Sequence, residues 1–195
     1  MPIYTTLSLK GGVGKTTSAL HLAAVAAAEG LPVTVLDADE ERSAMRWASH
    51  GGLPFEVVAA ERDGLARQVR ALAKDKRHVI IIDTPPNNRE ILSRAGMVAD
   101  AVIVPVVPTG LDINRLTPTL ELLHDLEASK GQLAVGILLT RWDERKILGR
   151  EAIEALRGFP LMKAKIRGLE RYAQSFGQVP TYLDEYKPAW KELQS

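Results

Sequence analysis

The 195-residue chain contains no cysteine. Disulfides, thiol catalysis, thiolate metal sites and cysteine-ligated iron–sulfur clusters are therefore excluded, and the chain is compatible with a reducing compartment. It also lacks an N-terminal secretion pattern and any apolar run near the ~20 residues that cross a bilayer, so we expect a cytoplasmic protein. A net charge of only +1 gives no global attraction to nucleic acid or membrane, so such a partner would need a local patch.

What the chain does contain is a regular alternation of apolar, β-branched runs with segments long enough for helices. Strands are expected at residues 3–9, 33–36, 79–82, 101–107 and 135–139, and helices at 16–29, 63–76, 114–128 and 149–157. Pro105 predicts a bulge or a strand end, because proline cannot donate to the ladder. The alternation predicts an α/β fold with a mostly parallel twisted sheet and helices on both faces. No repeat or linker marks a boundary, so a single domain over residues 1–195 is expected.

A glycine-rich loop joins the first predicted strand to the first predicted helix. Its residues are Lys10, Gly11, Gly12, Val13, Gly14, Lys15, Thr16 and Thr17. Free backbone N–H groups and the positive end of the helix dipole favour phosphate at such a junction, and glycines let the backbone approach it closely. Lys15 can lie along the β- and γ-phosphates, and the Thr16 hydroxyl can ligate Mg²⁺. The loop therefore predicts a P-loop that binds a nucleoside triphosphate with Mg²⁺.

Three aspartates follow the predicted strands, namely Asp37 and Asp39 after the second run and Asp83 after the third. Ligands collect at the carboxyl ends of parallel strands, so we expect these side chains to converge on the glycine-rich loop. Asp37 and Asp83 could hold waters of a bound Mg²⁺, and Asp39 could orient or deprotonate the attacking water. Each aspartate taken alone is equally compatible with a turn or helix-capping role.

The loop departs from the strict P-loop pattern, because Leu9 stands where that pattern has glycine and Lys10 adds a second lysine. In this respect it resembles the deviant Walker A loop of the ParA/MinD family, in which a signature lysine crosses a dimer interface to the other subunit's nucleotide. The resemblance extends over nearly the whole chain and includes residues 37–44, 83–86 and 105–112.

Thr140 and Arg141 stand where relatives often carry Asn-Arg against the adenine. The resemblance therefore adds Asp83, Thr140 and Arg141 to the nucleotide-binding residues of the glycine-rich loop. Arg141 is also compatible with an ordinary surface position. In the segment that begins at Asp37, Glu40 and Glu41 replace the family's Pro and Gln.

The resemblance implies an ATPase that uses ATP and Mg²⁺, with Lys10, Lys15 and Asp39 as its catalytic residues. It also implies a homodimer in the ATP state that binds double-stranded DNA without sequence preference on the nucleoid. A ParB-like or other small activator protein would stimulate hydrolysis and so segregate plasmid or chromosome DNA. The alternatives are a MinD-like positioning ATPase acting on another cargo or a membrane, and a P-loop small-molecule kinase or ligase. Residues 187–193 are short, contain a proline and are poor in apolar area, so no stable membrane association is expected.

Basic residues gather in one part of the sequence. Between Arg141 and Arg171 the chain carries nine basic and five acidic residues, a local net charge of +4. Several lysines and arginines on one face would give salt-sensitive DNA binding, and the candidates are Lys163, Lys165, Arg167 and Arg171. A solvated face without a partner is the alternative interpretation.

Overall fold

The computed structural model describes residues 2–61, 63–72, 75–109 and 116–194, and these ranges contain one seven-stranded sheet. Its order is β3-β2-β4-β1-β5-β6-β7, and all neighbouring strands run parallel. The strands are β1 (Ile3–Thr6), β2 (Val33–Asp37), β3 (Glu56–Ala59), β4 (Val79–Asp83), β5 (Ala101–Val106), β6 (Ala134–Trp142) and β7 (Leu161–Arg167).

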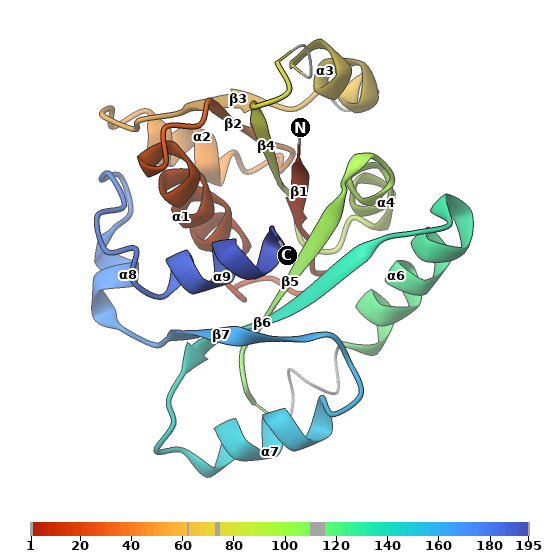
Figure 1. The fold of residues 1–195 in the computed structure, drawn as a ribbon, viewed down its shortest axis with the longest axis vertical. Coiled ribbons are helices and arrows are strands. Elements are labelled where there is room, and N and C mark those ends of the chain that lie inside the picture. The colour runs from red at the N-terminus through yellow and green to blue at the C-terminus, as the bar shows by residue number, and fades with distance from the viewer. Residues whose placement is uncertain (1, 62, 73–74, 110–115, 195) are drawn as a thin grey trace.

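Helices cover both faces of the sheet (Figure 1). They are α1 (Lys15–Ala28), α2 (Ser43–Ala48), α3 (Leu65–Leu72), α4 (Arg89–Val98), α6 (Thr117–Lys130), α7 (Ile147–Ala155), α8 (Glu170–Gln174) and α9 (Tyr186–Leu193). Buried residues of α1, α2 and α9 form one core cluster with the strands, and those of α3, α4 and α6 belong to two others. The predicted fold class is therefore confirmed. No helix in the described ranges is both long enough and apolar enough to span a bilayer.

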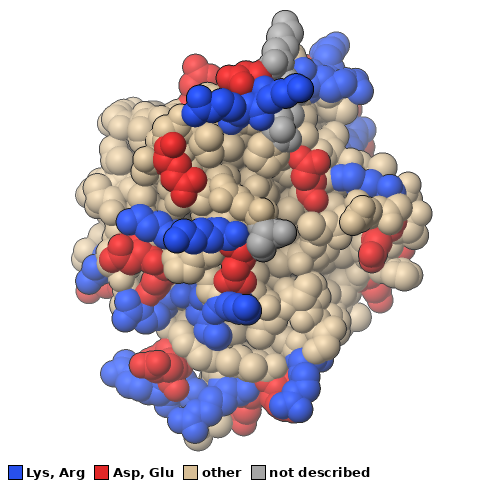
Figure 2. All heavy atoms as spheres, viewed as in Figure 1, with Lys and Arg blue, Asp and Glu red and all other residues tan. Residues whose placement is uncertain are grey.

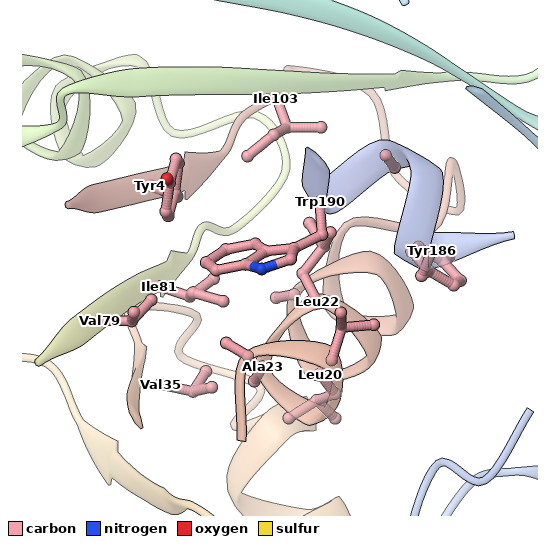
Figure 3. Close-up of a cluster of buried hydrophobic side chains, with 14 of the residues drawn as sticks. Tyr4, Leu20, Leu22, Ala23, Val35, Val79, Ile81, Ile103, Tyr186 and Trp190 are labelled. Atoms are coloured by element: carbon pink, nitrogen blue, oxygen red, sulfur yellow. The ribbon is translucent and has the colours of Figure 1, made fainter. Parts of the chain in front are cut away.

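Helix α1 leads away from the glycine-rich loop, and its composition explains its place in the core. Its many alanines favour the helix and are small enough for close packing on the sheet. The helix ends before Gly30, whose φ of 75° suits glycine and whose N–H donates to the Ala27 carbonyl. On the same side Trp190 of α9 is fully buried among side chains that include Tyr4 and Leu22 (Figure 3).

The five predicted strands and four predicted helices are present, with ends that differ by a few residues. The helices predicted at 63–76 and 114–128 run from Leu65 to Leu72 and from Thr117 to Lys130. Residues 73–74 and 114–115 lie outside the described residues, as do residues 110–112 of the 105–112 segment. Strands β3 and β7 were not predicted. Both are edge strands in which charged residues interrupt the apolar pattern, Glu56 in β3 and three basic residues in β7.

Pro105 lies one residue before the end of β5 and pairs in continuous register with Leu138, so of the two predicted possibilities the structure shows the strand end and not the bulge. The Ile103 carbonyl accepts from the Leu7 N–H, which shows that Ile103 faces β1 and that Pro105, two residues on, faces the same side. Because β1 has already ended at Thr6, the missing N–H of Pro105 costs the sheet no ladder bond.

Candidate nucleotide-binding site

The glycine-rich loop leaves β1 and enters α1 at Lys15. Gly12 and Gly14 have φ values of 73° and 95°, a region that favours glycine. The loop is braced from below by Thr140 of β6, whose hydroxyl donates to the Val13 carbonyl at 2.8 Å. A Cβ atom at Gly14 would lie 3.8 Å from Thr140 Cγ2, so the two segments are in close contact. Thr140 therefore shapes the loop, and its hydroxyl is already engaged there.

Lys15 points back into its own loop. Its side chain is buried, and Nζ donates to the Lys10 carbonyl oxygen at 2.9 Å. Burial lowers the pKa of Lys15, and the nearby charges of Asp83 and Asp39 partly offset that effect. The ammonium thus lies beside the Lys10 carbonyl and near two carboxylates, where phosphate oxygens could replace the Lys10 carbonyl as its partner.

Asp83, like Asp37, is fully buried. It pairs in register with Asp37 across β2 and β4, and its Oδ1 accepts from the Thr6 hydroxyl at 3.3 Å. Its pKa is raised to about 7, chiefly by burial and to a smaller extent by the charges of Asp37 and Asp39, while the Thr16 hydroxyl and Lys15 offset part of the rise. Among the described residues, its Oδ2 is a buried side-chain oxygen left without a hydrogen-bond partner.

That orphaned oxygen tests whether the predicted Mg²⁺ fits. Mg²⁺ keeps several of its waters, and a buried carboxylate oxygen beside Thr16 is a suitable acceptor for one of them. In the described part of the chain no three His, Cys, Asp or Glu side chains form a ready-made metal site. The residues therefore fit an ion whose remaining ligands are waters and phosphate oxygens, with Thr16, Asp37 and Asp83 as the predicted protein contacts.

Asp37 is the last residue of β2, and Asp39 lies in the turn between β2 and α2. The two carboxylate oxygens of Asp37 accept from the backbone N–H groups of Asp39 at 3.1 Å and Met45 at 2.9 Å, so Asp37 caps α2. The Asp39 carboxylate accepts from the Glu41 N–H at 2.9 Å. Asp39 lines the open cavity beside the loop, whereas Asp37 and Asp83 do not. The predicted convergence of the three aspartates is confirmed, and the geometry separates Asp39 from the other two.

Two adjoining cavities make up the site. The phosphate-side cavity, of about 480 Å³, is lined by the loop glycines, Lys15, Thr16 and Asp39. The outer cavity, of about 550 Å³, is lined by residues that include Lys146, Arg167 and Tyr172. Gly14, Thr17 and Arg141 line both. Both volumes lie in the range of small-molecule sites, and their arrangement suits a ligand with phosphates at one end and a base at the other.

Residues 4–178 match the model of the CobQ/CobB/MinD/ParA nucleotide binding domain. The chain belongs to this family. Among curated relatives, the protein ParA of Rhizobium radiobacter is 33% identical over 146 residues, which cover 72% of this chain and 64% of that protein. The maintenance of carboxysome distribution protein A of Gloeobacter kilaueensis is 33% identical over 181 residues, covering 89% of this chain and 80% of that protein.

The fold of this ParA/MinD-family domain also matches solved structures. Apo McdA from Cyanothece superposes with a TM-score of 0.79 at 20% identity, over 100% of both chains. The predicted resemblance to the ParA/MinD family is therefore confirmed, and with it membership of a family of nucleotide-binding ATPases. The match to ParA spans just under two thirds of that protein's length, so partners and cargo require arguments of their own.

Backbone strain in the ParA/MinD-family domain gathers around the site. Among the described residues, three non-glycine residues have positive φ, namely Arg42, Asn87 and Arg141. Arg42 and Asn87 lie in the segments that follow β2 and β4, and Arg141 lies in β6 next to its last residue. Such conformations are uncommon outside glycine and concentrate at functional sites. The positions of these strained residues therefore also indicate that the site lies at the carboxyl edge of the sheet.

Sequence reasoning missed several residues of this site. Trp47 and Phe176 line the phosphate-side cavity, and Lys146 and Tyr172 line the outer one. Arg167, predicted only as a DNA contact, also lines the outer cavity. All but Trp47 come from chain beyond residue 141. Lys146 follows β6, whereas Arg167, Tyr172 and Phe176 could have been located only if β7 had been recognised, because that strand returns the chain to the carboxyl edge of the sheet.

Proposed function

We propose that the chain is a positioning ATPase that binds ATP with Mg²⁺ and forms a homodimer in the ATP-bound state. The observation that carries this proposal is the bond between Lys15 Nζ and the Lys10 carbonyl. When phosphate oxygens attract the Lys15 ammonium, that bond is exchanged, which removes one restraint on the loop around Lys10. Nucleotide occupancy is then coupled to the residue that in this family reaches across a dimer interface.

In the proposed reaction the chain supplies position and charge. The loop N–H groups and Lys15 hold the phosphates, and Lys15 stabilises the charge that develops on them during transfer. Asp39, which lines the phosphate-side cavity, orients the attacking water. Bound Mg²⁺ would neutralise phosphate charge, with Thr16 and the buried oxygen of Asp83 as protein contacts. Arg141, which lines both cavities, is the proposed contact for the nucleoside.

Light scattering tests the proposed dimer. The wild type should show twice the monomer mass with a slowly hydrolysed ATP analogue and Mg²⁺, and a monomer mass with ADP. Lys10→Ala should bind the analogue but stay monomeric, whereas Lys15→Ala should lose binding. Lys76→Ala is the matched control, because Lys76 is exposed and precedes the amino end of β4, away from the carboxyl ends of the strands where the site lies. Equal masses with the analogue and with ADP would refute ATP-dependent dimerisation.

A basic surface formed by Lys163, Lys165, Arg167 and Arg171 is the proposed contact for double-stranded DNA. The first three alternate along β7 with buried apolar residues, so they lie on one side of the edge strand. Lys163 is exposed, Lys165 lies over the Trp142 ring, Arg167 pairs with Glu185, and Arg171 lies over the Tyr182 ring. Acidic atoms interleave with basic ones over the view in Figure 2.

This modest charge favours DNA binding by the dimer, where two basic surfaces act together and release more counterions. Fluorescence polarisation on duplexes of unrelated sequence should show binding with ATP, and little with ADP. Raising salt from ~50 to ~200 mM should weaken it at least ~10-fold. Equal weak affinity for DNA in every nucleotide state would indicate that the basic surface is a solvated face without a partner.

Lys163→Ala is the informative substitution, since Lys163 is exposed and lines neither nucleotide cavity. It should weaken DNA binding and reduce the salt slope by about one. Lys187→Ala, a change at an exposed lysine of α9, is the control. Arg167 is a poor probe, because changing it would also disturb Glu185 and the outer cavity.

The relatives of this chain differ in the cargo that their names imply. Relatives are named for ParA and for carboxysome distribution, so DNA segregation and the positioning of another cargo use similar chains. We propose a ParB-like or other small activator protein and a cytoplasmic, nucleoid-associated location. The test is ATPase stimulation by the purified product of the adjacent reading frame. No stable membrane association is proposed, because Tyr186, Ala189 and Trp190 of α9 are buried in the core; co-sedimentation with anionic vesicles would contradict this.

A further inference from the structure

Arg42 begins helix α2 in an unusual way. Its backbone is left-handed, with φ 54° and ψ 42°, a conformation that glycine adopts easily and other residues adopt rarely. Its side chain turns back toward the preceding strand, and Nη1 donates to the main-chain oxygen of Asp37 at 2.7 Å. The arginine therefore makes a contact that a glycine at this position could not make.

This contact closes the turn that carries Asp39. The Arg42 N–H donates to the Asp39 carbonyl at 3.0 Å, so the turn is also bonded at its centre. The Asp37 carbonyl that accepts the guanidinium also accepts the Ala60 N–H at 2.9 Å, beyond the end of β3. Arg42 thus ties the start of α2 to a point held by the sheet. Asp39 lies between the two tied ends, and the tie limits how far its carboxylate can move.

The Arg42 side chain borders a cavity that shares no lining residue with the phosphate-side cavity. This third cavity has a volume of about 250 Å³, and its other walls include Ala38, Glu40 and Ile91. Arg42 lines neither the phosphate-side cavity nor the outer cavity. Its positive charge also lowers the pKa of the Asp37 carboxyl, but it reaches Asp39 through the bonds of the turn. The third cavity leaves room for a small cation if the side chain is removed.

We propose that Arg42 is a positioning residue for hydrolysis, which holds Asp39 in place by tying the turn to the end of β2. This inference rests on the role of Asp39 in the proposed function. Loss of the tie should slow the chemical step and leave ATP binding nearly unchanged, because the residues that contact the nucleotide stay in place. A residue that only stabilised the fold would not produce that separation.

Single-turnover hydrolysis with enzyme in excess, together with a fluorescent ATP analogue for affinity, measures both quantities. Arg42→Ala should hydrolyse ATP ~10-fold more slowly and bind it within about twofold of the wild type. Arg42→Lys keeps one cationic donor and should recover most of the rate. Millimolar methylguanidinium, which fits the vacated space, should partly rescue Arg42→Ala and have no effect on the wild type. Arg46→Ala, at an exposed arginine one turn later on α2, is the control and should behave as the wild type.

Arg42→Gly separates side chain from backbone. Glycine keeps the left-handed conformation without strain and removes the tie, so this variant should be as slow as Arg42→Ala. A wild-type rate in Arg42→Gly or in Arg42→Ala would overturn the proposal. It can still be decided from the Gly and Lys variants if the Ala variant fails to fold.

Asp39→Ala, measured in parallel, separates this inference from the proposed function. If Asp39→Ala is slow while the Arg42 variants are normal, the tie is refuted and the role of Asp39 stands. If Asp39→Ala is itself normal, the proposed role of Asp39 is refuted, and slow Arg42 variants would then act by another route, which also overturns the inference.

Discussion

Replacing Asp83 by asparagine should change how the stability of the protein depends on pH. The pKa of Asp83 is raised from 3.8 to about 7, chiefly by burial. In the unfolded chain this acid is ionised above its ordinary pKa, whereas in the folded chain it keeps its proton until about pH 7. The contribution of Asp83 to the free energy of unfolding therefore falls as pH rises from about 4 to about 7. Above about pH 7 this contribution is constant. A shift of about three units corresponds to about 4 kcal/mol.

Asparagine has nearly the same shape and no charge, so that loss should disappear in Asp83→Asn. Its new N–H₂ group would occupy a place without an acceptor, which costs about 1–3 kcal/mol at every pH. The net gain at pH 8 is therefore small, and the pH dependence is the decisive quantity.

The assay is urea unfolding of both proteins between pH 4.5 and 8, in EDTA and without nucleotide. The difference in unfolding free energy between variant and wild type should rise by several kcal/mol across this range, and taking that difference cancels other titrating groups such as His21. Parallel curves for the two proteins would refute the reasoning. With Mg²⁺ and ATP present, the wild type should be the more stable of the two proteins, because it alone would gain the ligand's stabilisation.

The remaining predictions concern turnover, pH and packing. Asp39→Ala should lower the rate of hydrolysis at least ~100-fold while ATP binding persists. Near-normal turnover would mean that another group orients the attacking water. Burial lowers the pKa of His21 to about 4, so the wild type should lose about 3 kcal/mol as pH falls from about 6.5 to about 4, whereas His21→Gln should give a flatter urea profile. Trp190→Ala should lower the free energy of unfolding by about 3–5 kcal/mol in the same assay, because it leaves a cavity in the core and removes the donor to Glu29. A loss under about 1 kcal/mol would contradict the described packing of Trp190.

The sequence predicted the parts of this protein whose chemistry depends on local order. The loop from Lys10 to Thr17 and the aspartates at strand ends could be located because parallel strands bring their carboxyl ends to one edge. Contacts between distant segments were not predictable in the same way. The hydroxyl of Thr140, expected near the base, instead donates to Val13.

Two further features depend on geometry that sequence patterns do not carry. Strand β7 was missed because its basic residues alternate with apolar ones, and the charges were interpreted as a DNA-binding or solvated surface. The tie made by Arg42 depends on a left-handed backbone, which favours glycine or asparagine, so an arginine there gave no signal. Both features depend on the three-dimensional path of the chain, which sequence patterns do not specify.

Strand β7 also decides how copies of this protein can meet. It forms one edge of the sheet, and such an edge ordinarily offers its backbone N–H groups to a strand from another molecule. Here the N–H groups of Lys163 and Ala164 donate to the Glu192 carboxylate, and that of Arg167 donates to Glu185. Two glutamates of the chain's own C-terminal segment thus take the place of an incoming strand. Growth of a continuous sheet from β7 through successive molecules is disfavoured, which leaves faces rather than this edge for reversible, nucleotide-controlled assembly.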